Sequence, residues 1–144
     1  MGERGQGPGP GHGAACVQRG RVLVVDDEPH VRSTIQRLLG REHDVAVAAD
    51  GREALGMLDA GERYHVILCD LVMPHVSGVQ LYAALRQRGQ PCADRIVFMT
   101  GGAFTDEARR FLAEVACPRI EKPFDIHALR ALVRELVDRA AAGP

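Results

Sequence analysis

Two apolar stretches of this chain end on carboxylates. Asp26 and Asp27 follow residues 22–25, and Asp70 follows residues 66–69. One aspartate in such a place is ordinary, because its side chain favours the turn after a strand. Carboxylates from two separate stretches can also act chemically, because they can bind a hard cation or attack phosphorus as a nucleophile.

Two more polar residues end later apolar stretches. Thr100 follows residues 96–99 and precedes two glycines, which carry no side chain to block an approaching group. Lys122 precedes Pro123, which lacks an N–H donor and restricts the turn. Taken singly, the first is an ordinary turn residue and the second a surface lysine. Their meaning depends on whether the fold brings them to the three acids.

The hydrophobic pattern predicts five strands that alternate with five helices. The expected strands lie in the segments RVLVVDD, DVAVAAD, HVILCD, RIVFMTGG and PRIEKPF. The expected helices lie in VRSTIQRLL, DGREALGML, SGVQLYAALRQRG, TDEARRFLAEV and DIHALRALVRELV. Two of the helices begin with the spacing of a capping box, at Asp50 and Glu53 and at Ser77 and Gln80.

This order of elements predicts an α/β fold. Strands that are continuously apolar indicate a parallel sheet with helices on both faces. Residues 44–48 alternate instead, which places that strand at an edge. The short connections favour right-handed crossovers. We therefore expect a flavodoxin-like (βα)5 doubly wound parallel sheet of five strands in the order 2-1-3-4-5.

The polar residues converge in such a fold. Sites in open parallel sheets lie beyond the carboxyl ends of the strands, where the strand order reverses, here between the first and third strands. Asp26, Asp27 and Asp70 would meet there, and three like charges require a cation to stay ionised together. Oxygen ligands favour Mg²⁺. With Thr100 and Lys122 at the neighbouring strand ends, the pattern predicts a site that handles phosphoryl groups, with one carboxylate as the nucleophile.

Four segments resemble the receiver domain of two-component response regulators. They are VLVVDDEP, DLVMPHVSG, FMTGG and EKPF, and the resemblance covers about residues 21–140. It implies that Asp70 is the phosphoacceptor. It also implies that Asp26 and Asp27, together with Asp70 and the backbone carbonyl of Val72, hold Mg²⁺.

The same resemblance assigns the remaining site residues and the partners. Thr100 would be the switch hydroxyl and Lys122 the phosphate-binding lysine. The phosphoryl donor would be a histidine kinase or a histidine phosphotransfer domain, and phosphorylation would change the surface around residues 101–121. Such a chain modifies only its own aspartate, so we expect a phosphoacceptor domain and not an enzyme. The output would pass to a separate effector protein or to a fused kinase.

Two segments, TGGAFTDEARRFLAEV and PRIEKPFD, look most like receivers fused to hybrid sensor histidine kinases. A detached module of such a kinase is therefore the alternative to a stand-alone regulator. One position departs from the family pattern: three residues before the lysine, receivers usually carry Tyr or Phe, and this chain has Arg119. A guanidinium does not readily swing into a core. Either the switch works without an aromatic side chain or Arg119 makes surface contacts of its own.

Composition limits the other functions. The 144 residues suit one domain, and 18 Lys plus Arg against 19 Asp plus Glu give no basic excess for a nucleic-acid partner. No apolar run approaches the ~20 residues that span a bilayer. We therefore expect a soluble, cytoplasmic protein without nucleic-acid or membrane partners. The four cysteines lack the spacing of a zinc site or a disulfide framework.

The expected domain division has three parts. Residues 1–20 contain seven glycines and two prolines without a regular period, which predicts a disordered arm or linker. The receiver domain would occupy residues 21–140, and residues 141–144 would form a short tail.

Two other functions are compatible with an aspartate at a strand end. A Mg²⁺-dependent phosphatase of the haloacid dehalogenase type also uses an aspartate at a strand end, but typically as DxD after the first strand and often with a cap domain. Here the first strand ends in adjacent acids, and no cap is present. A pseudo-receiver that acts without phosphorylation would not need the intact set of acids, hydroxyl and lysine.

Overall fold

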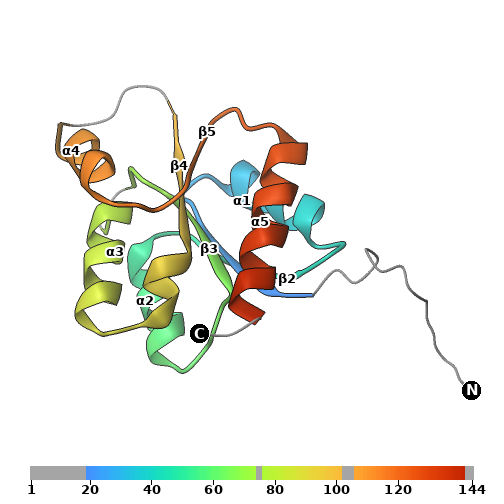
Figure 1. The fold of residues 1–144 in the computed structure, drawn as a ribbon, viewed down its shortest axis with the longest axis horizontal. Helices are drawn as coiled ribbons and strands as arrows, with labels where there is room; N and C mark the ends of the chain where they lie inside the picture. The colour runs from blue at the N-terminus through green and yellow to red at the C-terminus, as the bar shows by residue number, and fades with distance from the viewer. Residues whose placement is uncertain (1–18, 74–75, 102–105, 142–144) are drawn as a thin grey trace, which may run out of the picture.

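A parallel five-stranded sheet lies at the centre of the chain (Figure 1). The computed structural model describes residues 19–73, 76–101 and 106–141. All pairings are parallel and the order is β2-β1-β3-β4-β5, which confirms the predicted flavodoxin-like topology. The strands are β1 Arg21–Val25, β2 Asp44–Ala48, β3 Val66–Asp70, β4 Ile96–Thr100 and β5 Arg119–Glu121.

Helices cover both faces of this sheet (Figure 1). On one face lie α1 Pro29–Leu39 and α5 Ile126–Ala141; on the other lie α2 Gly51–Asp59, α3 Gly78–Gln87 and α4 Asp106–Glu114. A short 3₁₀ helix, η2 Pro91–Arg95, precedes β4 and was not predicted. Within the described ranges, no helix has the length and apolar character needed to cross a membrane.

The core consists of two layers, and alternate residues of each strand contribute side chains to one layer or the other. Leu23, Ile67 and Phe98 pack with α2, α3 and α4, whereas Val24 and Leu68 pack with α1 and α5. All five of these side chains are fully buried. This two-sided burial explains why β1, β3 and β4 are continuously apolar, since successive side chains of a strand point to opposite faces.

The edge strand and the helix starts follow the prediction with two differences. The strand β2 lies at the edge, but Val45, Ala46 and Val47 are all partly buried, so its two faces are less distinct than the alternation suggests. The Ser77–Gln80 capping box is confirmed at α3. At α2 the box is half formed, because the Glu53 carboxylate accepts from Ala49 N–H and not from Asp50 N–H.

The three described cysteines, Cys69, Cys92 and Cys117, are free. Cys69 and Cys92 belong to the core, where a thiol behaves as a small apolar group. Cys16 lies outside the described residues, as do residues 1–18 and 142–144. The division into an arm, a receiver domain and a tail therefore stays a prediction at both ends.

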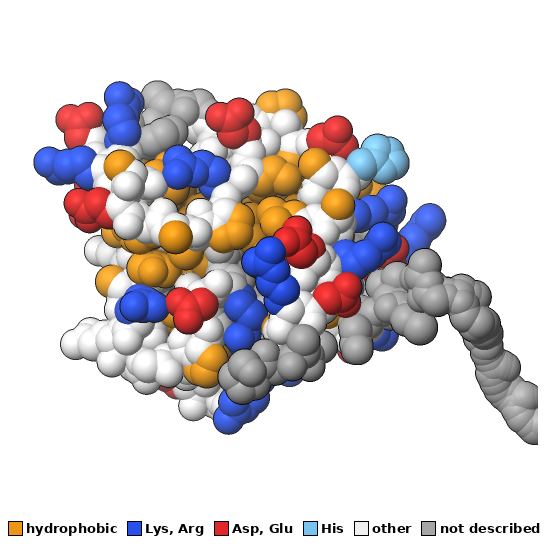
Figure 2. Space-filling model, in the orientation of Figure 1, with side chains coloured by type: hydrophobic (Ala, Val, Ile, Leu, Met, Phe, Trp, Pro, Cys, Tyr) orange, Lys and Arg blue, Asp and Glu red, His pale blue; other side chains and the backbone are white. Residues whose placement is uncertain are grey.

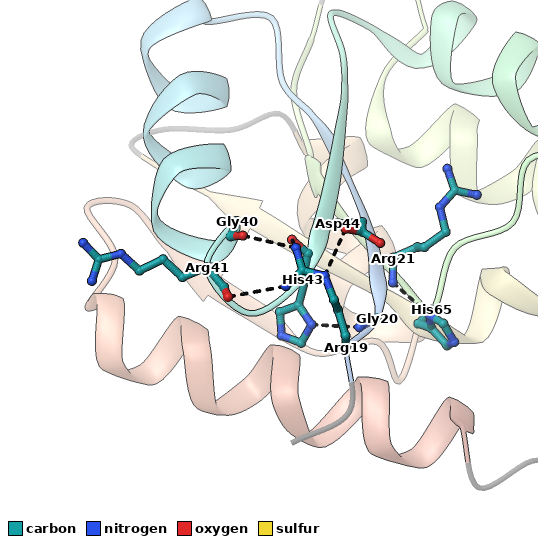
Figure 3. A network of polar contacts seen from close by, with 8 residues as sticks. All are labelled: Arg19, Gly20, Arg21, Gly40, Arg41, His43, Asp44 and His65. Atoms are coloured by element: carbon teal, nitrogen blue, oxygen red, sulfur yellow. Dashed lines mark hydrogen bonds and ion pairs between the residues drawn. The ribbon is translucent and has the colours of Figure 1, made fainter. Parts of the chain in front are cut away.

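A polar network holds the beginning of β1 at the amino ends of the strands (Figure 3). The guanidinium of Arg19 donates to the Asp44 carboxylate at 3.1 Å and to the His43 carbonyl at 3.3 Å. The backbone N–H of Gly20 donates to Nδ1 of His43 at 3.1 Å. One residue later, the N–H of Arg21 donates to Nδ1 of His65 at 3.0 Å. Two imidazoles thus accept consecutive backbone donors.

His43 is a buried titratable group in this network. Its side chain is 1% exposed, and Nε2 has no hydrogen-bond partner among the described residues. Burial lowers the pKa of His43 below its ordinary value, Glu42 opposes this shift, and the charges of Arg19, Arg134 and His65 add to it. Protonation at Nδ1 would also remove the acceptor for Gly20 N–H.

We expect this histidine to make folding acid-sensitive. In the pH range below about 6.5, the unfolded chain binds a proton that the folded chain does not, so the contribution of His43 is complete above that pH and is lost as the pH falls. The free energy of unfolding should therefore drop more steeply between pH 7 and 5 in the wild type than in His43→Asn. Asparagine keeps an acceptor for Gly20 N–H without titrating. Urea denaturation at several pH values measures both slopes; parallel slopes would rule out this role of His43.

Candidate functional site

The polar residues singled out in the sequence lie at the carboxyl ends of four strands. These strand ends form the upper edge of the sheet in Figure 1. Asp70 and Thr100 are the last residues of β3 and β4, Asp26 follows β1, and Lys122 follows β5. The register carries these ends side by side, since β3 pairs with both β1 and β4, and β4 pairs with β5. The parallel arrangement thus brings residues from distant parts of the sequence to one edge.

The three acids form one cluster. Asp26, Asp27 and Asp70 each offer a carboxylate oxygen, and these oxygens lie within 4.8 Å of one another. Asp26 is fully buried, the side chain of Asp70 is 14% exposed, and Asp27 is exposed. At these separations the carboxylates repel one another strongly when all are ionised.

Asp26 is held by hydrogen bonds on all of its polar atoms. Its Oδ2 accepts from Lys122 Nζ at 2.8 Å, and its Oδ1 accepts from Glu28 N–H at 2.9 Å. Its backbone N–H donates to the Ala48 carbonyl, and its carbonyl accepts from Arg32. In contrast, the Asp27 side chain has no hydrogen bond or ion pair within the described part of the chain. The two adjacent acids therefore have different environments.

Lys122 is the cation of the cluster. Its Nζ lies 2.8 Å from Asp26 Oδ2 and 3.5 Å from Asp70 Oδ2, so its shorter contact is with Asp26. Burial alone would lower the pKa of Lys122, but the hydrogen bond that it donates to Asp26 and the charge of Asp70 outweigh this effect and raise the pKa. The ammonium is therefore charged and shared between two carboxylates.

Asp70 keeps an unfavourable charge despite Lys122. Burial and the Asp26 carboxylate raise the pKa of Asp70 to about 6, against the lowering effects of Lys122 and of the Val72 N–H, which donates to Oδ1 at 3.4 Å. An additional cation beside Asp70 would remove much of this cost, because an opposite charge favours the ionised form.

A solvent-open pocket lies over this cluster. It is lined by Asp27, Glu28, Asp70, Val72, Gly101 and Lys122. Asp26 and Thr100 do not line it, and Thr100 is 7% exposed; the Thr100 carbonyl accepts from Lys122 N–H at 2.7 Å. The structure therefore brings the predicted residues to one edge but separates those that face the pocket from those that support it.

Two residues near the pocket were missed by the sequence interpretation. Glu28 contributes a further carboxylate to the lining, and its signal was its place directly after the acid pair. Arg32 contacts the backbone of Asp26, and its signal was a position four residues after Glu28 at the start of the helix.

A glycine allows α3 to begin close to the end of β3. A Cβ atom on Gly78 would lie 2.7 Å from the Asp70 carbonyl oxygen and 2.9 Å from Leu71 Cα, which is closer than real Cβ contacts allow. The Gly78 N–H donates to the Leu71 carbonyl at 3.0 Å. A larger side chain would therefore push α3 away from the end of β3.

Arg119 makes a surface contact of its own, which was one of the two alternatives expected at this position. It is exposed at the start of β5, and its Nη2 donates to the Leu112 carbonyl in the last turn of α4 at 3.0 Å. A cation there also interacts favourably with the helix dipole. The guanidinium therefore ties α4 to β5.

The donors of this cluster suit a hard divalent cation. The group within 4.8 Å contains carboxylates only, with no histidine or cysteine. Oxygen ligands of this kind match Mg²⁺, which binds through one or two carboxylates and keeps several waters. Of the three acids in the cluster, Asp27 and Asp70 face the pocket, so they fit direct contact with an ion better than Asp26 does.

Known proteins resemble this chain over most of its length. The transcriptional regulatory protein TcrA of Mycobacterium tuberculosis is 34% identical over 134 residues, which is 92% of this chain and 52% of TcrA. The sensor histidine kinase TmoS of Ectopseudomonas mendocina is 34% identical over 142 residues, which is 94% of this chain and 14% of TmoS. This chain thus spans about half of the first relative and a small part of the second.

Solved structures show the same fold. The receiver domain of the Francisella response regulator 1452 superposes with a TM-score of 0.72 at 27% identity and covers 85% of this chain and 99% of its own. The chemotaxis protein CheY4 of Vibrio cholerae gives a TM-score of 0.70 at 27% identity and covers 83% and 99%. The response regulator receiver domain family matches residues 22–134. Consequently this chain belongs to the receiver domain family of two-component response regulators.

Proposed function

We propose that this receiver is a phosphoacceptor switch in which Asp70 takes a phosphoryl group from a phosphohistidine with the help of Mg²⁺. The observation that carries this proposal is the placement of Asp70 at an open pocket between Lys122 and Asp27, whose side chain has no partner in the described part of the chain. Asp70 is the one acid of the cluster that both faces this pocket and contacts the lysine. Asp26 is buried behind it.

The transfer needs an ionised Asp70. One of its carboxylate oxygens would attack phosphorus, the P–N bond of the phosphohistidine would break, and the imidazole nitrogen would leave with the electron pair. The products are an acyl phosphate on Asp70 and, once the imidazole has taken up a proton from water, a neutral histidine on the donor. Mg²⁺, held by Asp27, Asp70 and the Val72 carbonyl, would neutralise phosphoryl oxygens. Lys122 would stabilise another phosphoryl oxygen through its ammonium.

The output of the switch would come from the segment after β4. Thr100 and Lys122 are joined through their backbones, so a phosphoryl group that attracts the Thr100 hydroxyl and the Lys122 ammonium would move both strand ends. The expected region, residues 101–121, includes residues 102–105, which lie outside the described residues. Apolar side chains lie among charged ones over α4, β5 and α5 (Figure 2), and Phe111 and Ile120 of this region are partly buried.

The donor in this proposal is a histidine kinase or a histidine phosphotransfer domain. The two relatives described above are a transcriptional regulatory protein and a sensor histidine kinase at the same identity. Both settings are therefore compatible with this receiver: a regulator that acts on a separate effector, or a module attached to a kinase. The chemistry proposed at Asp70 is the same in each.

Replacement of the phosphoacceptor tests the proposed function. Asp70→Asn should lose all Mg²⁺-dependent, hydroxylamine-sensitive labelling by a small phosphodonor, because an amide cannot form the acyl phosphate. Asp138→Asn, an exposed acid of α5, should be labelled like the wild type. Intact-mass spectrometry counts the added phosphoryl groups. Full labelling of Asp70→Asn would contradict the assignment.

The lifetime of the phosphoryl group would depend on Val72. Its side chain is 49% exposed and lines the pocket beside Asp70, where hydrolytic water must approach. Valine has neither a donor nor an acceptor in its side chain, so it cannot orient that water. The other position expected to do so, Gly102, lies outside the described residues and has no side chain.

We therefore expect the phosphoryl group on Asp70 to be long-lived and Val72→Asn to shorten its lifetime. An amide at this position could orient the water. General acid–base assistance raises reaction rates by about 10²–10⁴-fold, and we expect Val72→Asn to raise the rate of hydrolysis by about tenfold. Decay of the phosphorylated protein in excess Mg²⁺, after removal of the donor, measures the rate. Val72→Ile is the matched control and should decay like the wild type. Equal rates for all three proteins would show that residue 72 does not position the water.

A further inference from the structure

We infer that Arg32 is a positioning residue of the metal site: it fixes the turn that carries Asp27. This inference rests on the proposed function, because it concerns how the chain holds the cation used in phosphoryl transfer. Arg32 does not line the pocket and touches none of its carboxylates in a described contact. It acts through the backbone of Asp26.

Three hydrogen bonds close the turn between β1 and α1. The Glu28 N–H donates to Asp26 Oδ1 at 2.9 Å, and the Arg32 N–H donates to the Glu28 carbonyl at 3.2 Å. The third bond runs from Arg32 Nη1 to the Asp26 carbonyl at 2.8 Å and is partly buried. Together they enclose Asp27, which lies between Asp26 and Glu28 in the chain.

The third bond satisfies an acceptor that the sheet does not pair. The pairing of β1 with β3 ends at Val25, and the last backbone contact to β2 is the Asp26 N–H bond to Ala48. The Asp26 carbonyl lies beyond this ladder, on a residue that is fully buried. A buried carbonyl without a donor is unfavourable, so loss of the guanidinium would favour rearrangement of the turn.

The start of α1 makes the contribution of Arg32 more important. Glu28 is the N-cap of α1, and no side chain caps this helix end. The Asp27 side chain has no partner among the residues that the structure describes, so its carboxylate depends on the backbone of the turn for its position. Arg32 therefore ties the first turn of α1 to the end of β1, alongside the bond from Glu28 N–H to the Asp26 carboxylate.

A positioning role and a purely electrostatic role of Arg32 predict opposite changes in Mg²⁺ affinity when Arg32 is replaced. If Arg32 acted only through its positive charge, its removal would strengthen Mg²⁺ binding, because a nearby cation repels the ion. If Arg32 holds the turn, its removal weakens binding. Residues that orient metal ligands from behind typically change metal affinity about 10–100-fold when mutated, and we expect about tenfold for this exposed site.

A Mg²⁺ titration of the ¹⁵N-labelled full chain, followed by NMR at the amides of Asp27 and Glu28, tests this inference without any phosphorylation. Arg32→Met keeps the apolar stem but has no donor, and it should bind Mg²⁺ about tenfold more weakly. Arg32→Lys keeps the charge and one donor and should fall between Arg32→Met and the wild type. Arg37→Met, an exposed arginine of the same helix, should bind like the wild type.

Unchanged or tighter Mg²⁺ binding by Arg32→Met would overturn the positioning role. If Arg32→Met does not fold, Arg32→Lys decides, and binding as tight as in the wild type overturns the inference. A wild-type chain that shows no response to Mg²⁺ would overturn the proposed function and this inference together. A wild-type response with no loss in the Arg32 variants would overturn the inference alone.

Discussion

The site depends on an imbalance of charge: three clustered carboxylates face one ammonium. Lys122 is nearer to Asp26 than to Asp70, and Asp27 has no partner among the described residues. The ammonium of Lys122 therefore compensates the charge of the buried Asp26 more than that of Asp70. Of the cluster, Asp27 and Asp70 face the pocket, and burial together with the Asp26 carboxylate raises the pKa of Asp70. Such a pocket favours a divalent cation and, with it, the oxygens of a phosphoryl group.

The topology of the sheet makes this imbalance of charge possible. A parallel sheet with its order reversed between β1 and β3 brings the ends of neighbouring strands to one edge, and two apolar layers hold those strands in register. The close approach at Gly78 sets α3 beside the end of β3. The hydrophobic core therefore provides the stability that offsets the clustering of like charges.

Much of this arrangement could be predicted from the sequence, because it follows from regular patterns. Continuous apolar strands and short connections predict the sheet order, and strand ends predict that Asp26, Asp70, Thr100 and Lys122 share an edge. The pairing of Lys122 with Asp26 could not be predicted, since it depends on side-chain geometry between residues far apart in the chain.

Other features also lay outside the patterns. The short helix η2 has too few residues for a helical period. The Arg119 contact with the Leu112 carbonyl, and the burial of His43 beneath Gly20, depend on tertiary contacts between segments without a shared motif. The family resemblance assigns roles to positions, but it does not show which acid faces the pocket.

Thermal unfolding with and without Mg²⁺ tests the central claim most directly, since only the folded chain brings the carboxylates together. Mg²⁺ binding would stabilise the wild type by RT ln(1 + [Mg²⁺]/Kd), or about 2.7 kcal/mol at 100 times Kd. We predict a rise in Tm with Mg²⁺ concentration that is largely lost in Asp27→Asn and kept in the exposed control Asp44→Asn. No rise in the wild type, or an equal rise in Asp27→Asn, would contradict the account.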